Sequence, residues 1–374
     1  MSDHWSDLPD DLLHLVYSKV TALRHRVRFA AVCRQWRATE IRASYEAPPA
    51  LPWFIFSTSH DDDCKTRRAY CPEDGGVMRI QLPSALVGKR VVGAHDDGWV
   101  AALGDNMQLV VINLLSGAEV PLPAKDLRTV YSDRQSDVIW KVVFSESPTS
   151  SGCILAAITH EYGIALCRLG FPDSSWMSLS TQCGPSFMDI TFCSGQLYGK
   201  FCYQHIVKFK IGVNKDGGLV ISGEPQWLHI RWHSSDMLEY PNNIVELHGK
   251  LAMVGRTWSH GVRRGFKVFE LVDESSTEYD YKWEEVTSLG DYALFLGTMW
   301  SKVVYMPAAG RGGVQTNCIY ADDATYLTNL DGHGDHVYPM LDKSNDDVTQ
   351  WIKTAGCNVA VQSSTGTWVL PPDF

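Results

Sequence analysis

Two groupings of side chains in the sequence are suited to metal chemistry. His229 and His233 are four residues apart. On a helix that spacing would bring two imidazoles to one face, where they could bind a single metal ion. The surrounding segment, QWLHIRWHSSD at residues 226–236, is instead typical of a strand that runs into a turn. We therefore do not expect this pair to hold a metal.

The second grouping is the segment DGHGDH at residues 331–336, which holds two imidazoles and two carboxylates. Both groups are common metal ligands. Glycine and aspartate are also the residues that tight turns favour, so an ordinary surface turn explains the segment equally well. Metal binding here stays the minor alternative, and we predict no metal site and no cofactor.

Motifs of the common catalytic classes are absent from the sequence. It contains no G-x-S-x-G, no phosphate-binding lysine loop, no H-E-x-x-H and no G-x-G-x-x-G. Catalytic groups can still be assembled in space from distant parts of a chain, so an enzyme remains an alternative. The sequence favours a non-catalytic protein, and we assign no catalytic residues.

The charge balance argues against nucleic acid as a partner. The chain has 33 Lys and Arg against 43 Asp and Glu, a net charge of −10. Proteins that bind a duplex normally present a basic surface to the phosphates. The longest apolar run, Leu109 to Leu115, is interrupted by Asn113, and a membrane span needs about 20 apolar residues. We therefore expect neither nucleic acid nor a membrane as a partner.

The cysteines indicate a reducing compartment. The chain has ten cysteines, none of them in a C-x-x-C pair, and most lie inside apolar runs. Buried free thiols are the simplest interpretation. The acidic N-terminal segment MSDHWSDLPDD is unlike a secretory signal, and no N-x-S/T sequon is present. Together these features predict a location in the cytoplasm, the nucleus or both.

The first 46 residues follow a helical period. Residues 8–20 and 24–42 each carry one apolar stripe, and Pro9 suits the start of the first helix. Two short helices bury little surface against each other. We therefore predict a small all-α module whose apolar stripes complete their burial against a partner chain. The prolines of residues 47–50 are expected to form a linker.

From residue 51 to 374 the period changes to short strands separated by Gly, Asp, Ser and Pro, with no long helix between them. Trp176, Trp227 and Trp283 end successive units, so the repeat is about 50 residues long. That period predicts a mainly β chain: a single β-propeller of six or seven four-stranded blades, of the kelch size class. Residues 51–56 and 367–370 could share one blade and close the ring.

Several segments resemble a known family. LPDDLL at residues 8–13, followed by VCRQWR at 32–37, resembles an F-box. DGWV at 97–100, INLLSGAEVPLP at 112–123, FMDITF at 187–192, GQLY at 195–198, SLGDYALFLG at 288–297 and NCIY at 317–320 are similar to the plant F-box proteins that carry a C-terminal β-propeller. Leu114 replaces the usual proline of that family, and Ala321 replaces the usual aromatic residue, which leaves the predicted fold unchanged.

The resemblance implies a substrate-recognition subunit of an SCF-type cullin-RING ubiquitin ligase. The F-box would dock on a Skp-type adaptor, and through it on cullin and RING subunits, while the propeller would bind an unidentified protein target. The family pattern places these residues at the adaptor: Leu8, Pro9, Leu12, Leu13, Val16, Val32, Cys33 and Trp36. The alternative is a protein-binding propeller that acts outside a ubiquitin ligase. No residues are assigned to the target.

Overall fold

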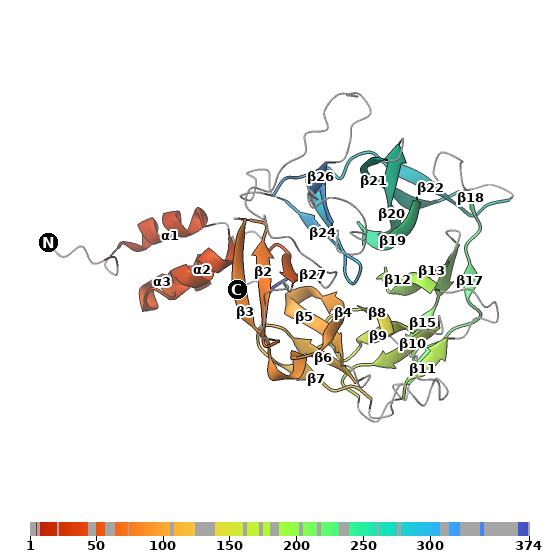
Figure 1. Cartoon of the computed structure of the whole chain (residues 1–374), viewed down its shortest axis with the longest axis horizontal. Coiled ribbons are helices and arrows are strands. Elements are labelled where there is room, and N and C mark those ends of the chain that lie inside the picture. The colour runs from red at the N-terminus through yellow and green to blue at the C-terminus, as the bar shows by residue number, and fades with distance from the viewer. Residues whose placement is uncertain are drawn as a thin grey trace.

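The computed structural model describes residues 5, 8–20, 22–43, 50–56, 64–73, 75–104, 108–123, 139–159, 163–171, 175–179, 187–201, 205–214, 218–231, 239–259, 262–274, 278–306, 314–321, 337–339 and 366–372. Figure 1 shows a small group of helices that lies beside a ring of sheets. The helical part ends at Ala43 and the first strand begins at Trp53. The predicted linker lies mostly outside the described residues, so its bounds stay a prediction.

The helical module contains three helices where the sequence predicted two: α1 (Asp10–Ser18), α2 (Leu23–Ala30) and α3 (Arg34–Ala43). The expected helix over residues 24–42 breaks at residues 31–33, so that expectation was wrong. Ala31 and Val32 donate to the carbonyls of Arg28 and Phe29, which ends α2 in a tight turn. The apolar period continues through the break, and periodicity therefore could not reveal it.

The module has a small core of its own. Leu13 and Tyr17 from α1 and Phe29 from α2 are buried together, with Leu8 and Trp36 packed against them. The Phe29 ring lies 5.3 Å from that of Tyr17 and 4.5 Å from that of Trp36. Aromatic pairs at such distances add to the energy of burial.

Six blades form the ring, which confirms the predicted propeller (Figure 1). The first three blades are, in spatial order, β27 (Thr367–Val369), β1 (Trp53–Phe56), β2 (Thr66–Cys71), β3 (Gly76–Gln81); β4 (Arg90–His95), β5 (Trp99–Leu103), β6 (Leu109–Asn113), β7 (Glu119–Val120); and β8 (Ile139–Phe144), β9 (Ile154–Thr159), β10 (Ile164–Arg168), β11 (Met177–Leu179).

The other three blades are β12 (Phe187–Cys193), β13 (Gln196–Phe201), β14 (Ile206–Phe209), β17 (Gln226–Trp227); β19 (Glu239–Leu247), β20 (Lys250–Ser259), β21 (Val262–Asp273), β22 (Tyr281–Val286), β18 (Ile230–Arg231); and β24 (Lys302–Tyr305), β23 (Tyr292–Leu296), β25 (Cys318–Ala321), β26 (Val337–Pro339). A separate hairpin, β15 (Ile211–Val213) with β16 (Leu219–Ile221), follows β14. The sixth blade departs from a simple meander because β23 pairs with β25 in parallel.

The repeat marked by tryptophans corresponds to the outer strands. Trp227 lies in β17 and Trp283 in β22, while Trp176 directly precedes β11. Each of these strands is the last meander strand of its blade. The interpretation that these residues end successive units is therefore confirmed.

The first and last strands close the ring, as the sequence suggested. Trp53 pairs with Val369, and Ile55 with Thr367, so β1 and β27 share the first blade. The Trp368 ring lies 5.2 Å from that of Phe54 and 5.1 Å from that of Phe295, which belongs to the sixth blade. This pairing covers strand edges that would otherwise be open.

The strands around the axis carry a recurring irregularity. β4, β8, β12 and β19 each contain a β-bulge, at residues 91–93, 139–141, 187–189 and 239–242. A bulge redirects the side chains that follow it. Neighbouring inner strands approach closely: a Cβ atom at Gly93 in β4 would overlap the carbonyl oxygen of Val142 in β8.

The helical module is joined to the first blade. The side chain of Leu23, at the start of α2, is 1% exposed and belongs to the same buried cluster as Leu51 and Cys71. Its backbone N–H donates to Glu73 Oε2 at 3.0 Å. The Arg24 guanidinium lies against the backbone of Gly76 in β3. The module is therefore held to the propeller by buried contacts.

Candidate functional site

The helical module presents apolar side chains on its surface. On α1 the exposed fractions of Leu12, Leu15 and Val16 are 47%, 58% and 42%. Val27 on α2 and Val32 after it are 47% and 52% exposed. Isolated exposed apolar residues are ordinary, but several on one small module are typical of a surface that a partner covers.

The eight residues predicted to contact the adaptor fall into two groups. Pro9, Leu12, Val16 and Val32 are exposed and Cys33 is half-buried. Leu13 is 0% exposed, and Leu8 and Trp36 pack against the buried cluster that contains it. In this conformation Leu13 supports α1 from inside the module, so its side chain is not free to contact a partner. The adaptor contacts themselves stay a prediction.

Sequence reasoning missed four exposed apolar residues of the described module: Trp5, which is 71% exposed, Leu15, Val27 and Ile41. Leu15 precedes Val16 and lies beside the chosen apolar stripe, so a wider stripe would have included it. Val27 and Ile41 stand among charged residues, where the apolar period gives no signal.

The start of α1 is held in place by α3. The Gln35 Nε2 atom donates to the Leu8 carbonyl oxygen at 3.0 Å and to Asp10 Oδ1 at 3.1 Å. The Trp36 Nε1 atom donates to the carbonyl oxygen of Trp5 at 3.1 Å. These bonds position the exposed side of α1 relative to α3.

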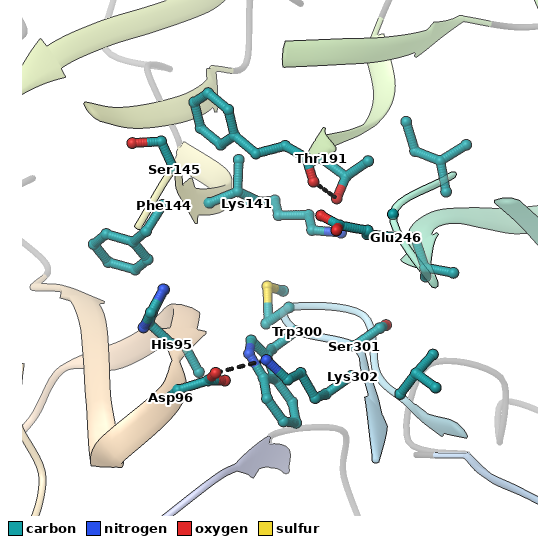
Figure 2. Close-up of a pocket in the computed structure, with 18 of the residues that line it drawn as sticks. His95, Asp96, Lys141, Phe144, Ser145, Thr191, Glu246, Trp300, Ser301 and Lys302 are labelled. Carbon is teal, nitrogen blue, oxygen red and sulfur yellow. Dashed lines mark hydrogen bonds and ion pairs between the residues drawn. The ribbon is translucent and has the colours of Figure 1, made fainter. Parts of the chain in front are cut away.

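A second candidate is a pocket of about 440 Å³ on the propeller axis. Its lining comes from the C-terminal parts of β4, β8, β12 and β19 and from the segment that leads into β24. Figure 2 shows its polar residues around one space, with aromatic residues between them. The labelled lining residues are His95, Asp96, Lys141, Phe144, Ser145, Thr191, Glu246, Trp300, Ser301 and Lys302.

Two ion pairs order the charges of this pocket. Lys302 Nζ lies 2.6 Å from Asp96 Oδ2 and so joins the sixth blade to the second. Lys141 Nζ lies 2.6 Å from Asp189 Oδ1, and their side chains are 10% and 4% exposed. Asp189 Oδ2 also accepts the backbone N–H of Ile244 at 2.8 Å. One carboxylate therefore links the inner strands of three consecutive blades.

Two histidines, His95 and His248, and the carboxylate of Glu246 also line the pocket. Burial lowers the pKa of His95, although Asp96 opposes this effect, and the lowered pKa favours the neutral imidazole. Its Nδ1 atom is buried and accepts or donates no hydrogen bond within the described residues. Glu246 forms no ion pair within the same residues. The carboxylate of Glu246 is therefore available to a ligand, whereas Nδ1 of His95 has no accessible surface in this conformation.

Two exposed apolar residues stand at the bulges of neighbouring inner strands. Trp140 in β8 is 52% exposed and Met188 in β12 is 46% exposed. They lie near the N-terminal ends of these strands, whereas the pocket lies near the C-terminal ends. The propeller therefore presents different chemistry at the two ends of its axis.

The metal candidates of the sequence receive no structural support in the described residues. His229 precedes the short strand β18, while His233 and residues 331–336 lie outside the described part of the chain. Among the residues that are described, no three His, Cys, Asp or Glu side chains gather as a metal would require. No described helix is long and apolar enough to cross a membrane.

The described cysteines are free thiols, most of them buried. Burial raises the pKa of Cys153, Cys193 and Cys318 to about 11. A thiol with a raised pKa is a poor nucleophile at neutral pH. These three residues therefore serve packing rather than covalent chemistry.

Comparisons with known proteins agree with this architecture. The sequence matches the F-box domain over residues 5–39 and the KIB1-4 beta-propeller over residues 69–347. F-box protein At4g35733 of Arabidopsis thaliana is 23% identical over 331 residues, which cover 79% of this chain and 82% of the relative. F-box protein At2g26160 of the same plant is 22% identical over 348 residues, which cover 85% and 95%.

Among solved structures, YCF48 from Cyanidioschyzon merolae aligns with 59% of this chain and 63% of its own length, at a TM-score of 0.35 and 13% identity. A structural similarity this low does not indicate a shared function. The family match, by contrast, spans most of the chain and coincides with the observed ring of blades. The chain therefore belongs to the KIB1-4 beta-propeller family and carries an F-box domain ahead of the propeller.

Proposed function

We propose that this protein is the substrate-recognition subunit of an SCF-type cullin-RING ubiquitin ligase. Its helical module docks on a Skp-type adaptor, which connects it to cullin and RING subunits, and its propeller binds the target protein. F-box and propeller domains typically serve as non-catalytic adaptor and receptor modules. The chain contributes proximity, since holding a target lysine near an activated thioester raises its effective concentration.

The exposed apolar surface of the helical module is the observation that carries this proposal. Leu12, Leu15 and Val16 lie on the outer side of α1, while the module already has its own core in Leu13, Tyr17 and Phe29. These exposed side chains are therefore not needed to hold the module together. An amphipathic helix with such a surface fits the apolar groove of a partner.

The buried free thiols support a location in the cytoplasm, the nucleus or both, because free thiols persist in reducing compartments.

The test is a pull-down of the full chain with a purified Skp-type adaptor. Val16→Asp places a charge on the proposed surface. Val213→Asp is its matched control, because Val213 lies in the β15 hairpin and its exposure is 43% against 42% for Val16. We expect Val16→Asp to weaken binding at least tenfold, since a desolvated unpaired charge costs more than 1.4 kcal/mol. Val213→Asp should bind as the wild type does.

Equal binding by both variants would refute the proposed surface. Failure of the folded wild-type chain to bind any Skp-type adaptor would refute the ligase role. That second outcome would favour a protein-binding propeller that acts outside a ubiquitin ligase.

A further inference from the structure

We infer that the axial pocket binds a cationic group, an ammonium or guanidinium, at the carboxylate of Glu246. The inference rests on the proposed function, because a Lys or Arg side chain on a target segment is the source that a receptor would meet. A free amine carries the same chemistry, so the experiment below separates the two sources.

Among the described residues, one carboxylate of the pocket lies in no ion pair. Two carboxylates, those of Asp96 and Glu246, line the pocket with the ammonium groups of Lys141 and Lys302 and the imidazoles of His95 and His248. Asp96 and Asp189 are each engaged at 2.6 Å by one of these lysines. Glu246 forms no ion pair among the described residues and its side chain is exposed to the pocket. Both lysines of the pocket are therefore neutralised by other carboxylates, and the charge of Glu246 is the one that no described lysine or arginine pairs with.

The second step is the hydrogen-bonding capacity of His95. Its Nδ1 atom is buried without a partner in the described part of the chain. A buried polar atom without a partner costs free energy, so such atoms usually have a partner in the functional state. A lowered pKa favours the neutral imidazole, whose Nδ1 could accept a hydrogen bond from an N–H group of a bound cation once a turn of the ring brings this buried atom to the pocket. The approach of that cation would meet no positive charge on His95 itself.

The walls of the pocket fit the stem of such a side chain. Phe144, Phe192 and Trp300 line the pocket and contribute aromatic surface to it. Long basic side chains lay their methylene groups along apolar surface while the charged end meets a polar partner. A volume of about 440 Å³ accommodates one or two side chains rather than a folded element.

An anionic ligand fits the pocket less well. It would have to displace Asp96 from Lys302 or Asp189 from Lys141, and Asp189 also holds the backbone N–H of Ile244. It would in addition lie close to the unpaired Glu246. The whole chain, with a net charge of −10, also favours cationic partners in long-range attraction.

The experiment measures binding of the full chain to nonapeptide libraries that are random except for a central Lys, Arg, norleucine or Glu. Spermidine alone forms a further arm. The variant is Glu246→Gln, which keeps the shape of the side chain and removes its charge. Its control is Glu119→Gln, which makes the same change on an exposed glutamate of β7, away from the pocket.

We expect the Lys and Arg libraries to bind at least tenfold more tightly than the norleucine and Glu libraries. Glu246→Gln should lose that preference and Glu119→Gln should retain it. Tight binding of spermidine that Glu246→Gln abolishes would equally support the cation site and would identify a free amine as its source. Preference for Glu or norleucine, no effect of Glu246→Gln, or no binding in any arm would overturn the inference. Because the adaptor pull-down is independent of the pocket, the proposed function would survive that result.

Discussion

The carboxylate of Asp189 should be a major determinant of propeller stability. It binds Lys141 at 2.6 Å and the backbone N–H of Ile244 at 2.8 Å, and so connects β8, β12 and β19. Asp189→Asn keeps the shape and one acceptor oxygen but leaves the ammonium of Lys141 without a counter-charge. Removing one partner of a buried ion pair costs about 3–5 kcal/mol, and we expect the lower end because the amide oxygen still accepts a bond.

That free energy converts into a measurable shift of the melting temperature. Unfolding entropy is about 2.1 cal/mol/K per residue. For the roughly 320 residues between β1 and β27, each 1 kcal/mol of destabilisation lowers Tm by about 1.5 °C. Asp189→Asn should therefore lower Tm by about 4–5 °C in a thermal melt of the full chain, followed by circular dichroism.

The matched control is Lys250→Ala. Lys250 pairs with Glu270 at 3.1 Å, but the lysine side chain is 55% exposed. Exposed pairs contribute at most about 1 kcal/mol, so this control should shift Tm by no more than about 1.5 °C. The double variant Lys141→Met/Asp189→Asn removes the stranded charge and should recover at least half of the loss. A shift of Asp189→Asn no larger than that of the control, or a double variant that melts lower still, would refute the reasoning.

Three other outcomes are expected from the structure. Burial lowers the pKa of His95, so the unfolded chain takes up a proton near pH 6.5 before the native state does. Stability should therefore fall as pH drops below about 6.5, which a comparison of Tm at pH 8 and pH 5.5 measures. His95→Gln, which leaves the neighbouring Asp96, Asp97 and Lys302 in place, should flatten this pH dependence of Tm. Native alkylation at pH 8, followed by mass spectrometry, should modify exposed Cys64 well before the buried thiols of Cys153, Cys193 and Cys318; equal rates would contradict the burial. Deletion of residues 366–374 removes β27 with its buried Trp368 and should abolish the cooperative melt, whereas an unchanged curve would show that ring closure is dispensable.

Much of the fold could be predicted because each blade is encoded locally. The tryptophans that end the blades and the turns between short strands repeat at a regular distance, and the closing strand could be identified because it was left over at the end of the chain. The break between α2 and α3 escaped prediction, since the apolar residues Phe29, Val32 and Trp36 keep one period through it. The parallel pairing of β23 with β25 has no local signal, because it depends on which strands meet in space.

The candidate sites, like the fold, could be predicted only in part. Leu12 and Val16 could be identified on a helical stripe, but the stripe did not reveal that Leu13 turns into the module's own core. The pocket was not predicted at all. Its residues, such as His95, Lys141 and Glu246, come from strands about 50 or 100 positions apart, and only the closed ring brings them together.

If the protein acts as the proposed ligase subunit, the joint at Leu23 bears on which lysines of a target can be modified. That residue is buried with propeller residues and its N–H donates to Glu73, so in the proposed ligase the helical module and the ring would act as one arm. A bound target would then be held at one distance and one orientation relative to the helical module, whereas a target on a flexible linker would sample many. The modified lysine would be chosen by where it lies on the surface of the target and not by the sequence around it. Loosening the joint would broaden the pattern of modified sites while leaving both binding events intact.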